Sequence, residues 1–197
     1  KVAEYETEYF VINDNPYLSS LIKSLNFLRL LRCGEDIDGV HSACHLNCKT
    51  IDDKGNTVPN FGGWHDAGDL SQFEIPTAEM ANALLDLYLN IKDEAIKERI
   101  LAEAKVGISW LLRTRFSDGS RALAVSYSIW RNNELEPIDN TVTISKAEKG
   151  PFESFCSASA LAVAARCFED PIYSDWCLRI AKEDFEYARK WYKEGIY

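Results

Sequence analysis

Residues 62–69 of the chain read Gly-Gly-Trp-His-Asp-Ala-Gly-Asp, which places two aspartates three positions apart. The glycines before and between Asp66 and Asp69 favour backbone conformations that other residues rarely adopt, so the stretch predicts a tight turn. Such a turn presents both carboxylates to one small volume, where a single water molecule could bridge them. Inverting glycoside hydrolysis needs this arrangement, because a carboxylate base activates water while a separate carboxylic acid protonates the leaving oxygen.

Two other interpretations of the aspartate pair remain open. Asp-x-x-Asp spacing beside glycines is common in ordinary turns that carry no chemistry. The carboxylates could also bind calcium, although calcium requires more oxygen ligands than we can assign in the surrounding sequence.

The aspartate pair lies in a long polar segment, residues 35–73, which lacks helical periodicity and is therefore expected to be functional. All three histidines of the chain and three of its six cysteines lie in or beside this segment: Cys33, His41, Cys44, His45, Cys48 and His65. Thiolate and imidazole are the preferred ligands of zinc, and a shell of two cysteines and two histidines leaves no position for water. Such a metal would be structural.

We assign the predicted zinc site to Cys33, Cys44, His45 and His65. His41 and Cys48 are the competing ligands, which a four-coordinate site cannot also accommodate. The alternative is that these are unrelated loop residues, since the spacing is not the paired CxxC pattern of many zinc sites. The remaining cysteines, Cys156, Cys167 and Cys177, fall in helical patterns and are expected to be small core residues.

Hydrophobic spacing predicts five helices separated by connections. The helices are expected from Asn15-Pro16 to about Cys33, from Pro76 to about Ile91, from Asp93 to about Arg115, from near Pro151, and from Asp170-Pro171 onward. Residues 117–150 are expected to form a hairpin or a long excursion, because alternating apolar residues follow a Ser-Asp-Gly turn. Alternation near the N-terminus predicts an extended arm over residues 1–12, whose strand partner we expect in a preceding domain.

Charge and hydropathy exclude two classes of partner. The formal net charge is −9, and no Lys/Arg cluster offsets it, which argues against binding to nucleic acid. The most apolar stretch, Leu18 to Leu31, is broken by Lys23, Asn26 and Arg29, so no membrane-spanning segment is expected.

The 62–69 motif, continued by Gln72-Phe73 and Ile75-Pro76, resembles the signature of family 9 glycoside hydrolases. Other segments fall in the same order as in that family: Arg32-Cys33-Gly34, Cys44-His45, Trp110-Leu111-Leu112 and Asp170-Pro171. The resemblance covers nearly all of the chain from about Phe10 onward. Members of the family are inverting, cellulase-type enzymes built on an (α/α)6 barrel, which implies a carbohydrate substrate.

The resemblance implies roles for individual residues. Asp69 would be the general base, Asp66 would help to hold the water, and Trp64 would pack beneath them. Some family members carry a structural zinc bound by two cysteines and two histidines, at positions that match Cys33, Cys44, His45 and His65. Trp64 and Trp130 are the candidate substrate-binding residues, although Trp130 and Tyr127 also suit a strand's packed face.

The expected fold is therefore all-α: a partial (α/α)6 barrel over residues 13–197, with a long metal-binding loop and the N-terminal arm. A complete barrel has twelve helices, and the general-acid glutamate of the family would lie beyond Tyr197. We therefore expect the chain alone to be inactive and its parent to hydrolyse a β-glucan or a related saccharide. Exposed half-barrel faces could lead to self-association.

Two other functions compete with this interpretation. Another (α/α)6 enzyme, such as a polysaccharide lyase, would share the helix pattern. A non-enzymatic, zinc-stabilised helical module that binds carbohydrate or protein would share the cluster. We expect a secreted or periplasmic location, with the cytoplasm as the alternative.

Overall fold

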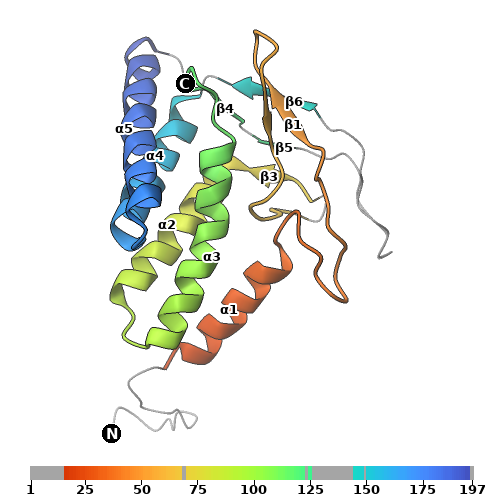
Figure 1. The fold of residues 1–197 in the computed structure, drawn as a ribbon, viewed down its shortest axis with the longest axis vertical. Coiled ribbons are helices and arrows are strands. Elements are labelled where there is room, and N and C mark those ends of the chain that lie inside the picture. The colour runs from red at the N-terminus through yellow and green to blue at the C-terminus, as the bar shows by residue number, and fades with distance from the viewer. Residues whose placement is uncertain (1–15, 68–69, 123, 126–143, 149, 196–197) are drawn as a thin grey trace, which may run out of the picture.

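The computed structural model describes residues 16–67, 70–122, 124–125, 144–148 and 150–195 (Figure 1). In these residues, five helices dominate: α1 (Leu18–Leu30), α2 (Glu74–Asn90), α3 (Glu94–Arg113), α4 (Pro151–Cys167) and α5 (Pro171–Lys193). Six short strands accompany them: β1 (Lys49–Ile51), β2 (Thr57–Pro59), β3 (Gln72–Phe73), β4 (Arg121–Ala122), β5 (Ala124–Val125) and β6 (Ile144–Glu148). The expected helical fold is confirmed.

Local sequence explains where the helices begin. Asp93 accepts a hydrogen bond from the Ile96 amide at the start of α3, and Asp170 does the same for Ile172 and Tyr173 in α5. These side chains satisfy amide groups that have no partner within the helix. Helix α2 begins at Glu74, before the predicted start at Pro76, because the first turn tolerates a proline that cannot donate a hydrogen bond.

The core lies between α2, α3 and α4, and α5 packs along α4 (Figure 1). Helix α3 turns a stripe at helical spacing toward the core, and every member is buried: Ile96, Ile100, Ala104, Ile108 and Leu111. The buried alanines let the helix axes approach closely: Ala78 and Ala81 in α2, and Ala158, Ala160 and Ala164 in α4. Cys167 and Cys177 are buried in the core, and Cys156 is half-buried against it.

The strands lie at the end of the helices where α3 ends and α2 and α4 begin (Figure 1). One sheet has the order β2-β1-β6-β4, in which β1 pairs parallel to β6 and antiparallel to β2. A second sheet pairs β3 with β5. The polar segment 35–73 thus contains short strands that its sequence did not predict.

Several predictions fall outside the described residues: the arm over residues 1–12, Asp69, Tyr127, Trp130 and most of the 117–150 excursion. Within the described part of the chain, no helix is both long enough and apolar enough to cross a bilayer.

Candidate metal centre and aspartate turn

The Cys/His cluster forms where the chain leaving α1 meets the 62–66 segment. The Cys33 amide donates a 3.0 Å hydrogen bond to the Gly63 carbonyl, and the His65 amide donates one of 2.7 Å to the Leu31 carbonyl. Arg32 and Trp64 therefore face each other in an antiparallel bridge. This pairing brings Cys33 beside His65, although they are far apart in sequence.

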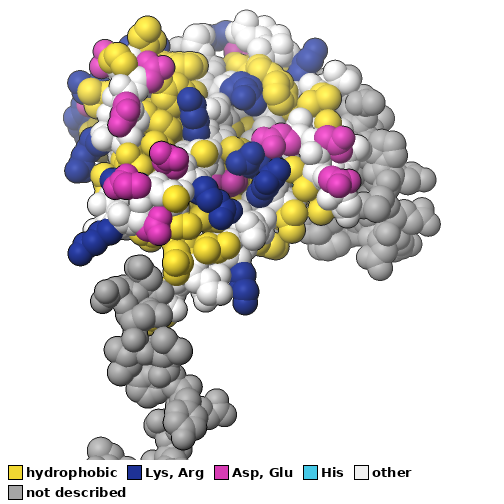
Figure 2. Space-filling model, turned by 60° about the horizontal axis from the view of Figure 1, so that its bottom comes forward, with side chains coloured by type: hydrophobic (Ala, Val, Ile, Leu, Met, Phe, Trp, Pro, Cys, Tyr) yellow, Lys and Arg dark blue, Asp and Glu magenta, His cyan; other side chains and the backbone are white. Residues whose placement is uncertain are grey.

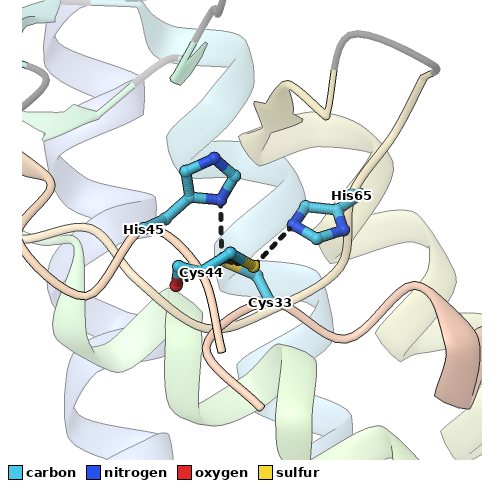
Figure 3. A group of neighbouring side chains, drawn as sticks. All are labelled: Cys33, Cys44, His45 and His65. Carbon is cyan, nitrogen blue, oxygen red and sulfur yellow. Dashed lines mark hydrogen bonds between the residues drawn. The ribbon is translucent and has the colours of Figure 1, made fainter. Parts of the chain in front are cut away.

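The four predicted ligands converge (Figure 3). The ligand atoms of Cys33, Cys44, His45 and His65 all lie within 4.8 Å of one another. Cys33 Sγ is 3.3 Å from His45 Nδ1, and Cys44 Sγ is 3.3 Å from His65 Nε2. The two sulfur atoms are 3.9 Å apart.

These separations fit one tetrahedral zinc ion. Zinc bonds of about 2.3 Å to sulfur and about 2.0 Å to nitrogen place neighbouring ligand atoms roughly 3.3–3.8 Å apart. The four side chains are at most 3% exposed, so water is excluded from the cluster. A closed, buried shell of two thiolates and two imidazoles suits a structural ion.

The two thiols are not equivalent in the absence of metal. Their mutual hydrogen bond lowers the pKa of Cys44 far below its ordinary value and raises the pKa of Cys33. The two thiols therefore titrate as a pair rather than independently. A cation that displaces the remaining proton would complete the ligand set.

The competing ligands lie beside the cluster. His41 Nδ1 is 4.0 Å from Cys44 Sγ and 2.8 Å from the Ser42 carbonyl oxygen. The His41 ring meets the His65 ring edge-on, with centroids 5.2 Å apart. Cys48 is buried nearby but is not one of the four converging residues.

Trp64 fixes the 62–66 segment against α3. Its indole nitrogen donates a 2.8 Å hydrogen bond to Glu103, which also accepts one of 2.8 Å from Arg32. The ring lies so close to Gly107 that a Cβ atom there would be 2.5 Å from it. Trp64 is only 5% exposed, so most of its surface packs inside the protein. Glu103 and Gly107 were not predicted from sequence, because only the folded chain brings them to Trp64.

Asp66 follows a metal-ligand candidate directly and is exposed to solvent. Its amide donates a 2.7 Å hydrogen bond to the Ser71 carbonyl, and the Leu70 amide donates one of 2.8 Å to Ala67. These bonds tie together the backbone on either side of residues 68–69. The buried Gln72 side chain reinforces the base of the turn by donating to the Gly62 carbonyl.

A cavity of about 460 Å³ opens beside this turn, between α1 and α2. Trp64, His65 and Asp66 contribute to one part of its lining, and aliphatic and aromatic side chains of the two helices form most of the rest. The turn is thus the polar part of a largely apolar hollow.

Comparisons with known proteins agree on one family. The profile of glycosyl hydrolase family 9 matches residues 17–197. Endoglucanase D of Acetivibrio thermocellus is 25% identical over 210 residues, covering 91% of this chain and 33% of that enzyme. The chain therefore spans about a third of the length of this relative.

Solved structures show the same fold. A metagenome-derived glycoside hydrolase family 9 endoglucanase superimposes with a TM-score of 0.75 at 25% identity, covering 89% of this chain and 36% of that one. A Zn-binding triple mutant of the family 9 endoglucanase J30 superimposes with a TM-score of 0.66 at 23% identity, covering 96% and 41%.

Proposed function

Because the chain belongs to glycosyl hydrolase family 9, we propose that it forms part of an enzyme that hydrolyses β-glycosidic bonds in a glucan with inversion of configuration. The relatives named endoglucanases support a glucan as the substrate class. The chain contributes the aspartate turn, in which Asp69 is the general base and Asp66 helps to hold the attacking water. Trp130 is the proposed contact to the sugar, whereas Trp64, which is 5% exposed and bonded to Glu103, supports the turn from beneath and is not retained as a sugar contact.

The observation that carries this proposal is the direct link between the metal cluster and the aspartate turn. His65 is one of the four converging residues, and Asp66 is the next residue in the chain. The hydrogen bonds from His65 to Leu31 and from Asp66 to Ser71 fix the backbone on both sides of that link. Anchoring of this kind holds a base within the narrow range of productive positions.

We propose that Cys33, Cys44, His45 and His65 hold a structural zinc ion. The ion would supply four bonds that rigidify an irregular loop, and it would leave no position for substrate or water. The cluster would orient His65, and His65 would in turn orient the aspartate turn that follows it.

The general acid belongs to polypeptide outside residues 1–197 in this proposal. The chain spans 33% of the length of Endoglucanase D, which leaves room in such a longer protein for the acid. Without an acid the leaving oxygen stays unprotonated, and we therefore expect no turnover by the 197-residue chain alone.

The test is Asp69→Asn in the longer protein, assayed on carboxymethylcellulose. Loss of a general base should lower kcat by about 10²- to 10⁴-fold while substrate affinity is retained. Asp53→Asn, in the exposed β1–β2 turn, serves as the matched control and should leave kcat unchanged. Full turnover by the Asp69 variant would contradict the proposal. So would an unchanged protein that binds glucan but does not hydrolyse it. The second result would favour a binding module.

A further inference from the structure

One face of α3 packs against the segment that leads into the aspartate turn. Four residues at helical spacing form this face: Glu103, Gly107, Trp110 and Arg113. The Trp64 ring packs against Gly107, and Gly63 lies against the Trp110 ring, where an added Cβ atom would be 3.0 Å from it. Gly63 has a φ of +71°, which glycine adopts readily, so the segment can approach the helix this closely. The helix thus supports the segment from below.

Charged side chains hold the segment at both ends of this face. At the C-terminal end of α3, the Arg113 guanidinium donates to the Phe61 carbonyl and lies 4.5 Å from the centre of the Phe61 ring. At the other end of the face, the Glu103 carboxylate accepts hydrogen bonds from the side chains of both Arg32 and Trp64. Glu103 therefore joins α3 to both of the segments that pair beside the Cys/His cluster.

The Arg32–Glu103 contact has the geometry of a strong ion pair. Arg32 Nε and Nη2 lie 3.2 Å and 2.8 Å from the two oxygens of the carboxylate. Such two-point, charge-assisted hydrogen bonds are stronger than neutral ones and fix the relative orientation of their groups. The oxygen that Arg32 Nε contacts also accepts the 2.8 Å bond from the Trp64 indole. Both oxygens are therefore engaged, and one of them serves both segments.

Burial separates this ion pair from charges at the surface. On the face seen in Figure 2, basic and acidic side chains are interspersed among apolar ones at the surface of the protein. The Glu103 side chain, in contrast, is only 6% exposed, and the Arg32 side chain is 19% exposed. Exposed pairs contribute little because water screens them, whereas a buried carboxylate must keep its partners. The Glu103 contacts are thus expected to persist where surface pairs open.

The contacts of Glu103 bypass the proposed metal ligands. Arg32 and Trp64 each immediately precede a proposed ligand in the chain, but neither is among the four converging residues. The cluster and Glu103 therefore hold the same pair of segments at adjacent positions through different side chains. Asp66 follows Trp64 by two residues, so a displacement of Trp64 is passed on to the aspartate turn.

Resting on the proposed function, we propose that Glu103 is a positioning residue of the hydrolytic reaction. Its carboxylate holds Arg32 and Trp64 against α3 and thereby keeps the aspartate turn in its productive position, as an anchor separate from the metal cluster. Glu103 acts through Trp64 and does not need to touch the sugar. A misplacement of about 1 Å at a catalytic group can cost about 10²-fold in rate, so loss of such an anchor should reach the reaction itself.

The competing role for Glu103 is purely structural, in which its ion pair stabilises the fold and has no effect on the turn. The chain offers a matched control in Asp184, a buried carboxylate that also pairs with arginine. Its partners, Arg115 and Arg121, lie just beyond the end of α3 and in β4, and neither belongs to the segments that Glu103 joins. A purely structural role predicts the same behaviour for Glu103→Gln and Asp184→Asn.

The first measurement is amide hydrogen exchange of the 197-residue chain, unchanged or with Glu103→Gln or Asp184→Asn. The informative amides are those of Cys33, His65 and Asp66, which donate backbone hydrogen bonds within and beside the paired segments. We expect Glu103→Gln to accelerate their exchange by at least about tenfold through local opening, with the metal content of the chain unchanged. Asp184→Asn should not single out these amides.

Unchanged exchange at these amides would overturn the proposal, as would an equal acceleration in the Asp184→Asn chain. Metal loss caused by Glu103→Gln would mean that the residue acts through the cluster, which would also overturn the claim of a separate anchor. Should Glu103→Gln not fold, Trp64→Phe is the milder variant, because it removes only the indole donor. It should accelerate exchange at the same amides, and unchanged exchange would again overturn the proposal.

The second measurement is hydrolysis of carboxymethylcellulose by the longer protein. Glu103→Gln should lower kcat per folded molecule by at least about tenfold and change KM by less than about twofold, because the turn moves while the sugar contacts stay. Asp184→Asn should lower the melting temperature and leave kcat per folded molecule within about twofold of the unchanged value. The same kcat for both variants would overturn the proposal. A longer protein that never hydrolyses glucan, although exchange responds as expected, would count against the proposed function alone.

Discussion

The protein contains two buried polar clusters that are built in opposite ways. In the first, Arg115 and Arg121 donate to opposite oxygens of Asp184, over 2.6 Å and 2.5 Å. Arg121 also donates to the Leu111 carbonyl. In the second, two thiols and two imidazoles converge, and neither lysine nor arginine is among the four.

This difference separates a cluster that supplies its own countercharge from one that could hold an ion. The arginines of the first cluster neutralise Asp184 as soon as the chain folds, because Arg115, Arg121 and Asp184 all belong to the same chain. The second cluster directs four potential ligand atoms at a common point, where they could hold a metal ion. The comparison predicts that removing metal affects the region around the Cys/His cluster and leaves the region around Asp184 intact.

The largest effect is expected from metal removal. Structural zinc contributes on the order of 10 kcal/mol in small zinc domains, so a strong chelator should cost several kcal/mol here. Amide exchange should accelerate at Cys33 and His65, while helix content and the amides of α4 and α5 stay protected. Cys44→Ser should mimic chelation, and Cys156→Ser, which lies outside the cluster, should not. Complete metal loss with no change in exchange would refute the structural role.

A smaller but global effect is expected from Asp184→Ala. The substitution leaves the 2% exposed Arg121 without its carboxylate, and breaking a buried pair in this way costs about 3–5 kcal/mol. Glu186→Ala, which removes an exposed pair with Arg189 on the same helix, is the control and should cost at most about 1 kcal/mol. Urea unfolding measures both, and equal losses would mean that the buried cluster contributes no more than a surface pair.

The last effect appears only as a dependence of stability on pH and concerns Glu74, which interacts electrostatically with Arg121 and Asp184. Burial raises the pKa of Glu74 from 4.5 to about 8. The folded state therefore binds more protons than the unfolded state between these values, and stability falls as pH rises through that window. The slope is at most about 1.4 kcal/mol per pH unit. Glu74→Gln should flatten the plot of unfolding free energy against pH between pH 5 and pH 8. Parallel plots for the two proteins would contradict the raised pKa of Glu74.

Sequence predicted the helices well because their information is local. Asp93 and Asp170 mark helix starts within a few residues of the groups they cap, and the α3 stripe repeats at helical spacing. The strands were missed because their pairing is not local: β1 has three residues, and one of its partners, β6, follows more than 90 residues later. A three-residue strand shows too little alternation to be recognised.

The candidate site could be predicted only in part, because some of its residues are close in sequence and others meet only in the folded chain. Cysteine and histidine are rare enough in this chain that a concentration of them attracts attention, and the four chosen residues do lie together. Glu103 could not be found in this way, because a glutamate in a helix usually faces solvent. Its burial against Trp64 and Arg32 follows only from how α3 meets the loop. Asp69 and Trp130 lie outside the described residues, so their roles stay predictions.

The most direct test of the zinc-anchored turn is X-ray absorption spectroscopy of the chain purified under reducing conditions. We predict one zinc ion per chain, with two sulfur ligands at about 2.3 Å and two nitrogen ligands at about 2.0–2.1 Å. A folded protein without bound metal, or with a shell dominated by oxygen, would contradict the account.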